Sequence, residues 1–217
     1  MRMRRESIDG IVSSVMRVVL QSLAKHPRNV LINYHGALTI FELEYNSAGA
    51  RVAILEEQGI DVLCSCIKGF PLPEGEDVIE EEKRNGGADS SQLSTFDVHD
   101  VALNALGLLA SHDKRSKRMI GVGGGIAACL HSIEAQWGTG SQGNVLTLGV
   151  ALDLLQSLTQ DAENAREFVE DGGRHENAAA KARSRGVNCI VTSMTLFPNN
   201  TTIFGASCGV IVNCCCV

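Results

Sequence analysis

Residues 151–173 read ALDLLQSLTQDAENAREFVEDGG, and the spacing of their small and apolar residues occurs twice more upstream. When Ala37 and Ala102 are aligned with Ala151 without gaps, Gly59 and Gly124 align with Gly173. The aligned positions in between are apolar: Leu38, Leu103 and Leu152; Phe41, Leu106 and Leu155; Ile54, Met119 and Phe168; Leu55, Ile120 and Val169. Such self-similarity predicts stacked helical units, because one unit cannot bury its apolar face alone.

Hydrophobic periodicity predicts further helices on both sides of this stretch. Their ranges are 11–23, 31–41, 50–58, 60–67, 98–110, 126–137, 187–197 and 201–215. In the first of them the apolar face consists of Ile11, Val15, Val18, Val19 and Leu23. Gly59 is predicted to end a short helix in the left-handed conformation.

Two polar insertions interrupt the pattern. Residues 72–97 are rich in acidic side chains, and residues 174–186 carry mixed charge, so both are predicted to be solvated loops. The basic run KRSKR at 114–118 is predicted to be a surface turn, and GTGSQGN at 138–144 a flexible link.

The two ends of the chain resemble each other. The tetrapeptide at 26–29, HPRN, matches FPNN at 197–200, and Ile32 then corresponds to Ile203. The last part of the chain is therefore predicted to repeat the first, with incomplete units at both ends.

A short helix ending in glycine, a second helix opening with Ile and a third with a small-Leu-x-x-Leu core resemble the armadillo repeat. The closest local matches are GVGGGIAACLHSI at 121–133 and ENAREFVEDGG at 163–173. The resemblance implies an all-α, right-handed α-solenoid of three-helix repeats over residues 1–217, with about four units, the first and last incomplete.

The resemblance also implies that the third helix of each unit lines a concave groove that binds extended peptides or partner helices. The corresponding positions here are Thr39, Leu43, Asn104, Leu108, Asp153 and Ser157. None of these pairs is the Trp and Asn pair of importin-type members, so binding of nuclear signals is not expected. Glu42 and Asp153 suggest instead a groove of modest negative charge.

Charge and composition limit the classes of partner and the cellular compartments that we expect for this protein. The formal net charge of −6 argues against nucleic acid as the main ligand and favours basic peptides or proteins. The apolar run at 11–23 is too short and too polar to span a bilayer. We therefore expect a protein of the cytoplasm, with the nucleus as an alternative, and its eight cysteines as reduced thiols.

The sequence contains no complete motif for catalysis, cofactor binding or metal binding. The glycines at 121–125 lack the Gly or Ala at 126 that a dinucleotide loop needs, and fit a turn between helices better. The cysteine and histidine spacings fit no zinc site, and no G-x-S-x-G is present. Cys64, Cys66, Cys129, Cys189 and Cys208 are predicted to be small buried residues. Cys214, Cys215 and Cys216 are either exposed thiols or lipidation sites.

The first functional hypothesis is a non-catalytic scaffold that binds a partner protein or peptide along the concave face. The alternative is a fragment or regulatory arm of a larger protein, such as a kinase or ligase, in which the array positions substrates. The apolar C-terminal end, GVIVNCCCV, would also allow self-association. No enzymatic activity, cofactor or metal is expected.

Overall fold

The computed structural model describes residues 2–70, 93–137, 145–170 and 185–216, and its regular elements in these ranges are all α-helices. They are α1 (Arg2–Lys25), α2 (Val30–Asn46), α3 (Ala48–Glu56), α4 (Gly59–Lys68), α6 (Thr95–His112), α7 (Lys114–Val122), α8 (Gly125–Trp137), α9 (Val145–Leu158), α10 (Ala162–Glu170), α11 (Arg185–Leu196) and α12 (Thr201–Cys215). The prediction of an all-α fold is confirmed for these residues.

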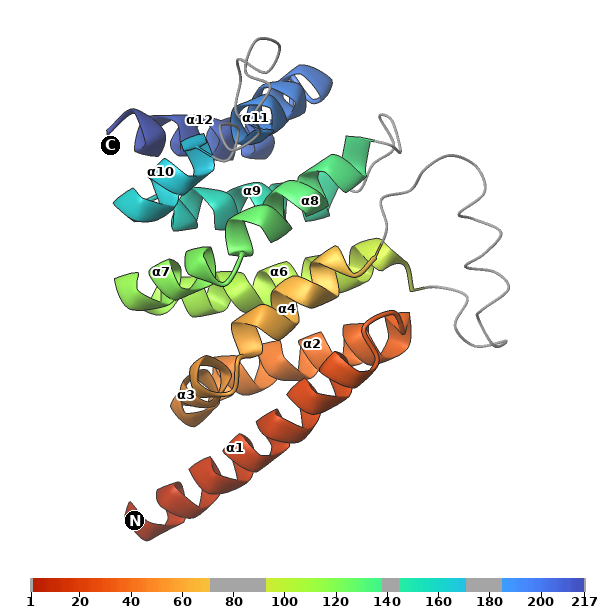
Figure 1. The fold of residues 1–217 in the computed structure, drawn as a ribbon, viewed down its shortest axis with the longest axis vertical. Helices are drawn as coiled ribbons and strands as arrows, with labels where there is room; N and C mark the ends of the chain where they lie inside the picture. Colours follow the sequence, from red (N-terminus) through yellow and green to blue (C-terminus); the bar gives the residue numbers. More distant parts are fainter. Residues whose placement is uncertain (1, 71–92, 138–144, 171–184, 217) are drawn as a thin grey trace.

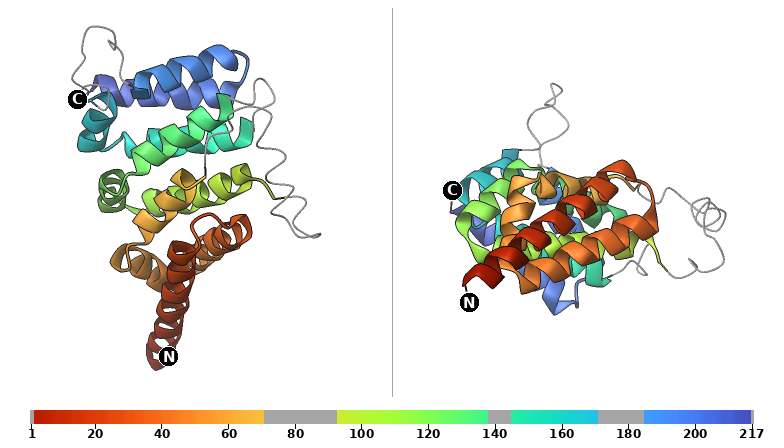
Figure 2. Two further views of the ribbon diagram at one scale, coloured as in Figure 1. Left: turned by 45° about the vertical axis from the view of Figure 1, so that its right-hand side comes forward. Right: turned by 90° about the horizontal axis from the view of Figure 1, so that it is seen from below.

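The helices are stacked along the long axis in chain order (Figure 1). Helices α2, α6, α9 and α12 each pack on the next, and we call them the front layer. Helices α1, α4, α8 and α11 form a second layer packed against it, with α4 and α8 nearer to the viewer in Figure 1, and the short helices α3, α7 and α10 lie at one edge of the stack (Figures 1 and 2). One cluster of buried apolar side chains extends through the stack, from Met16 to Val210.

A short helix followed by two longer ones occurs three times: α3, α4 and α6; α7, α8 and α9; α10, α11 and α12. The short helices are each nine residues long. Each is capped at its start by a side chain: the Ser47 hydroxyl, the Asp113 carboxylate and the Asp161 carboxylate accept hydrogen bonds from backbone N–H groups of the first turn. The prediction of a turn at 114–118 is therefore wrong, because Asp113 starts a helix there.

The caps also correct the alignment of the middle unit. The residue seven positions after each cap is buried, and these residues are Ile54, Ile120 and Phe168. The gap-free alignment paired Met119 with them and placed Ile120 with Val169, which is 43% exposed. The alignment is displaced by one residue in the middle unit, because α6 has 18 residues and α2 has 17.

The turns before α4 and α8 differ from the expectation for Gly59. The left-handed residue is Gln58, with φ of 58°, and its counterpart is Gly124, with φ of 86°. Gly59 instead allows a close approach, since a Cβ there would lie 2.9 Å from the Ile54 carbonyl oxygen. The glycines at 123 and 124 join α7 to α8, so the prediction of a helix-joining turn is confirmed.

The buried face of α1 is only partly the one predicted: Leu23 is buried and Val19 packs half-buried against the core, as predicted, but the other three positions are exposed. Met16, Leu20 and Leu23 are buried against α2, α3 and α4. Ile11, Val15 and Val18 are 61%, 42% and 62% exposed. The helix has apolar residues on two faces, and periodicity alone does not choose between them.

The similarity of the two ends is confirmed in detail. Asn29 and Asn200 both precede a helix in extended backbone, at ψ of 108° and 107°. The Asn29 side chain accepts a hydrogen bond from the Ile32 N–H at 2.9 Å, and that of Asn200 accepts one from the Ile203 N–H at 3.0 Å. The matching sequences therefore build the same helix start twice.

Both predicted loop insertions are shorter at their C-terminal ends. Helix α6 already begins at Thr95, because Ser94 and Asp97 form a reciprocal capping box. Helix α11 begins at Arg185, whose guanidinium bonds Glu134 of α8 at 2.6 Å. The remainder of 72–97 and of 174–186, the link at 138–144 and Gly173 lie largely or wholly outside the described residues.

A carboxyl group is buried where α2, α3 and α6 meet. Glu44 is fully buried, and its carboxylate oxygens have no hydrogen-bond partner among the described residues. Burial raises the pKa of Glu44 to about 8, against the opposing effect of the Arg51 charge. His112 Nε2 lies 4.0 Å away, and burial lowers the pKa of His112. Glu44 is therefore largely protonated at neutral pH, beside an uncharged histidine.

Glu44→Gln should remove a pH dependence of stability. The folded chain holds the Glu44 proton up to a pKa of about 8, whereas an unfolded glutamate loses it near about 4.3. Between these values the folded state binds more protons, so the free energy of unfolding falls as pH rises, by at most about 1.4 kcal/mol per unit. Urea unfolding at pH 5.5, 7 and 8 should show this fall in the wild type and a smaller one in Glu44→Gln. The exposed Glu42→Gln is the matched control, and equal slopes in Glu44→Gln and the wild type would contradict the assignment.

Candidate protein-binding face

The front layer has one broad surface that turns away from the second layer, and we call it the front face. Asn104 of α6 lies between Ala102 and Leu106, and both of these are fully buried. Two positions along a helix correspond to about 200°. Since its neighbours on both sides point into the core, Asn104 points out of the layer.

The same reasoning places three more predicted positions on the front face. Leu108 is flanked in this way by the buried Leu106 and Ala110. Asp153 of α9 lies between Ala151 and Leu155, and Ser157 between Leu155 and Thr159, all of them buried. Asp153 is exposed, and Asn104, Leu108 and Ser157 are half-buried. The structure thus brings these four predicted residues onto one surface across two adjacent helices.

Helix α2 is oriented differently. Thr39 and Leu43 are half-buried, and Leu43 packs against the core. They follow Gly36 by three and seven positions, and at Gly36 a Cβ would lie 2.5 Å from Leu23 of α1. Leu43 lies within about 20° of Gly36 around the helix, so α1 covers the side of α2 that carries Leu43. Thr39 follows the exposed His35 by four positions, about 40° around, and lies nearer to the outward side.

The outward side of α2 also carries His35 and Glu42. Both are exposed, and each is flanked at two positions by buried residues: Asn33 and Ala37 around His35, and Ile40 and Glu44 around Glu42. The alignment did not select His35, because the position of α1 cannot be read from the spacing within α2.

The front layer is free of cationic side chains apart from histidine. The four helices, all within the described ranges, contain no Lys or Arg. Their partly or fully exposed carboxylates are Glu42, Asp97, Asp100 and Asp153. Burial raises the pKa of Asp100, helped by the charge of Asp97, and burial also raises the pKa of Asp153. These carboxylates lack a compensating cation in their own layer, so a cation from outside would be favoured there.

Hydrogen bonding leaves acceptors on this surface. Asn104 Nδ2 donates to the Asp100 carbonyl of its own helix at 2.8 Å, and its Oδ1 has no partner among the described residues. Thr39 Oγ1 donates to the His35 carbonyl at 2.7 Å. The front face therefore offers carboxylate and amide oxygens to the N–H groups of a ligand.

The other polar clusters of the described residues do not form a site for a metal or a catalytic reaction. His99 and His131 are brought within 5.9 Å between ring centroids, which the scattered sequence positions did not suggest, and burial lowers the pKa of His99 to about 4. No group of three or more His, Cys, Asp or Glu suited to a metal ion occurs in the described part of the chain. None of its helices has the length and apolar character needed to cross a membrane.

The cysteines are all free thiols. Cys64, Cys66, Cys129 and Cys189 are buried, as predicted, whereas Cys208 is half-buried. Burial raises the pKa of Cys64, Cys66 and Cys189 to about 12, so these thiols stay protonated and unreactive. Cys215 and Cys216 are exposed at the end of α12.

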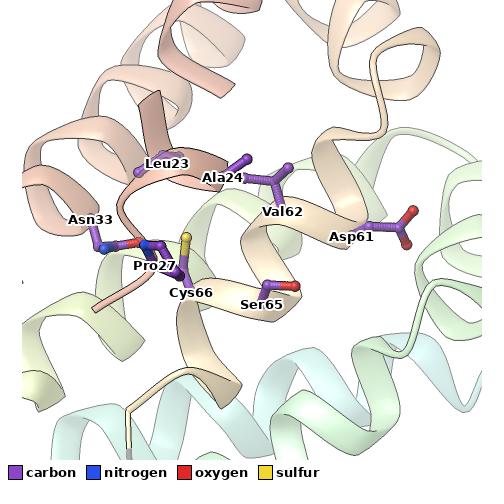
Figure 3. A pocket seen from close by; sticks show the side chains of 8 residues that line it. All are labelled: Leu23, Ala24, Pro27, Asn33, Asp61, Val62, Ser65 and Cys66. Atoms are coloured by element: carbon purple, nitrogen blue, oxygen red, sulfur yellow. The ribbon is translucent and has the colours of Figure 1, made fainter. Parts of the chain in front are cut away.

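A hollow of about 280 Å³ lies between the end of α1, the start of α2 and α4 (Figure 3). Asn33 in its lining is buried, and its Nδ2 donates to the carbonyls of His26 and Asn29, at 2.8 Å each. Asp61, the charged residue of the lining, is exposed. Asn33 thus holds the turn onto α2, which gives it a structural role.

Comparison of the chain with protein-family models, with curated proteins and with solved structures yields no match.

Gly107→Ala tests whether the front face is open in the free protein. Gly107 is in the interior of α6, and a Cβ there would meet nothing within 4 Å. Alanine should raise the free energy of unfolding by about 0.5–1 kcal/mol, because it loses less backbone entropy in a helix. The control is Gly125→Ala, where the Cβ would lie 2.7 Å from the Ile120 carbonyl oxygen and should destabilise. Urea unfolding measures both, and a destabilised Gly107→Ala would mean that this surface is covered.

Proposed function

We propose that the chain is an armadillo-type α-solenoid that binds an extended segment of a partner protein along the front face. Three rounds of short helix and helix pair, each with a capped nine-residue helix, support the armadillo interpretation. In that interpretation α6, α9 and α12 are the third helices of successive units, and α2 belongs to an incomplete first unit. The front face is then the concave side of a right-handed superhelix.

The observation that carries the proposal is the juxtaposition of Asn104, Leu108, Asp153 and Ser157 on adjacent helices. An extended peptide crossing α6 and α9 would find hydrogen-bond acceptors at Asn104 and Asp153. Leu108, one turn after Asn104 on α6, would add an apolar contact. Such binding needs no catalytic group.

The charge of the front layer selects the kind of partner. Its helices carry carboxylates and no Lys or Arg, so a segment containing Lys or Arg is attracted and an acidic one is repelled. Because these carboxylates are partly exposed, the attraction should weaken as the salt concentration rises.

Asn104→Ala combined with Asp153→Asn should weaken binding of a basic peptide about tenfold, since it removes one amide acceptor and one charge. The probe is a fluorescein-labelled peptide of alternating Lys and Ala, titrated by anisotropy at low and at high salt. Circular dichroism should be unchanged, because both side chains point away from the core.

The matched control is Glu56→Gln combined with Glu170→Gln, two exposed carboxylates on the short helices α3 and α10. It removes more charge than the test variant and should leave the affinity near that of the wild type. Equal weakening by both pairs would mean that net charge, and not the front face, binds the peptide. Salt-independent binding would likewise contradict the proposal.

A further inference from the structure

The short helix α7 is strongly basic. Four of its nine residues are Lys or Arg, and none is Asp or Glu. At about 100° per residue, Arg118 lies opposite the buried Ser116 and Ile120. Lys114 and Arg115 are exposed and lie within about 60° of Arg118 around the helix, so α7 presents a basic surface to the outside.

The first two of these cations stand at the end of the helix that favours carboxylates. The N-terminal end of an α-helix carries a partial positive charge, so anions stabilise it and cations oppose it. Helix α4 has Asp61 in its first turn and α10 has Glu163, whereas α7 begins with Lys114 and Arg115. A local charge that opposes the fold is typical of a functional site.

The neighbouring carboxylates do not neutralise this surface. Asp113 accepts a hydrogen bond from the Ser116 N–H at 2.6 Å, and of the effects that lower the pKa of Asp113 the Arg115 charge is the smallest. The two cations of the first turn form no ion pair among the described residues. Arg118 pairs with Glu163, but these side chains are 49% and 60% exposed, and such a pair is weak enough to be exchanged for another carboxylate.

An exposed apolar residue adjoins the basic side chains. Val122 follows Arg118 by four positions, on the same side of α7, and is 79% exposed. We call Lys114, Arg115, Arg118 and Val122 the basic edge. It lies between α3 and α10 in the interior of the stack, within the range 93–137 that the structure describes without a gap, so it is not a surface left uncovered by an end of the chain (Figure 1).

The size and surroundings of the basic edge limit what fits it. A helix of nine residues is about 13.5 Å long, the length of about four residues of an extended chain. The short helices on both sides carry exposed carboxylates, such as Glu56 of α3 and Glu170 of α10. These would repel a long nucleic acid or an anionic membrane, and α7 has no aromatic residue on which a base could stack. A short acidic stretch of a protein fits in both charge and length.

We propose that the basic edge binds a short acidic segment of a partner protein. Arg115 and Arg118 hold carboxylates of this segment, because a guanidinium pairs with a carboxylate through two parallel hydrogen bonds. Val122 contacts an apolar side chain next to them. The basic edge thus attracts the opposite charge to the front face and is a second, separate binding surface.

Anisotropy of a fluorescein-labelled peptide of alternating Glu and Ala tests this proposal. The full chain should bind the peptide at low salt and more weakly at high salt. Arg115→Gln combined with Arg118→Gln should raise the dissociation constant about tenfold, with unchanged circular dichroism because both side chains are exposed.

The matched control is Lys25→Gln combined with Arg28→Gln. It removes the same charge from two exposed positions at the turn from α1 to α2, at the opposite edge of the stack (Figure 1). This variant should bind the acidic peptide like the wild type.

Lys114→Glu separates loss of binding from loss of folding. A carboxylate in the first turn of α7 should raise the midpoint of urea unfolding, because it complements the helix dipole. The same change should weaken binding of the acidic peptide. A variant that is more stable and yet binds less well has not lost binding through unfolding.

Three results would overturn the proposal: no salt-sensitive binding of the acidic peptide by the wild type, unaltered binding in the double arginine variant, or equal weakening in the control. Tighter binding of oligodeoxythymidine or of phosphatidylserine vesicles through the same two arginines would assign the surface to a nucleic acid or a lipid, and would also overturn it. Asn104→Ala with Asp153→Asn should still bind the acidic peptide, so failure here and failure of the front-face proposal are distinguishable.

Discussion

Burial of one helix side against the next is the interaction on which this structure depends. Each front-layer helix contributes small and aliphatic residues to a continuous core, such as Ala37, Ala102 and Ala151, which are fully buried. Small side chains let the helices approach closely, and Leu and Ile fill the space between them. A unit separated from its neighbours would leave that side in water, so the units stabilise one another.

The front face is a consequence of the same packing. Each inner helix of the front layer packs one side on the core and two sides on neighbouring helices, and its fourth side points outward. The outward sides of α6 and α9 carry Asn104 and Asp153, which can contact a ligand without disturbing the core.

Much of the fold could be predicted because its boundaries depend on local chemistry. The helix at 201–215 was predicted with the bounds that the structure has, and Asn200 caps its start. The outward positions of α6 and α9 follow from helical periodicity around Ala102 and Ala151. What the sequence could not show depends on distant contacts: which face of α1 is buried, how α1 covers Leu43, and the extra residue in α6 that moved Ile120 out of alignment. Capping by Asp113 was visible in the sequence, but the basic residues after it suggested a turn.

Because each layer contacts mainly its neighbours, the resistance of a helix to local unfolding depends on its place in the stack. Helix α1 packs on α2, α3 and α4, and α12 packs on α9, α10 and α11, so the two ends are coupled only through the layers between them. Local opening of one end then need not propagate to the other. Amide hydrogens in α6 and α9, which have neighbours on both sides, would exchange more slowly than those of the outermost helices. We therefore expect local stability to be highest in the central layers and to fall toward both ends of the described stack.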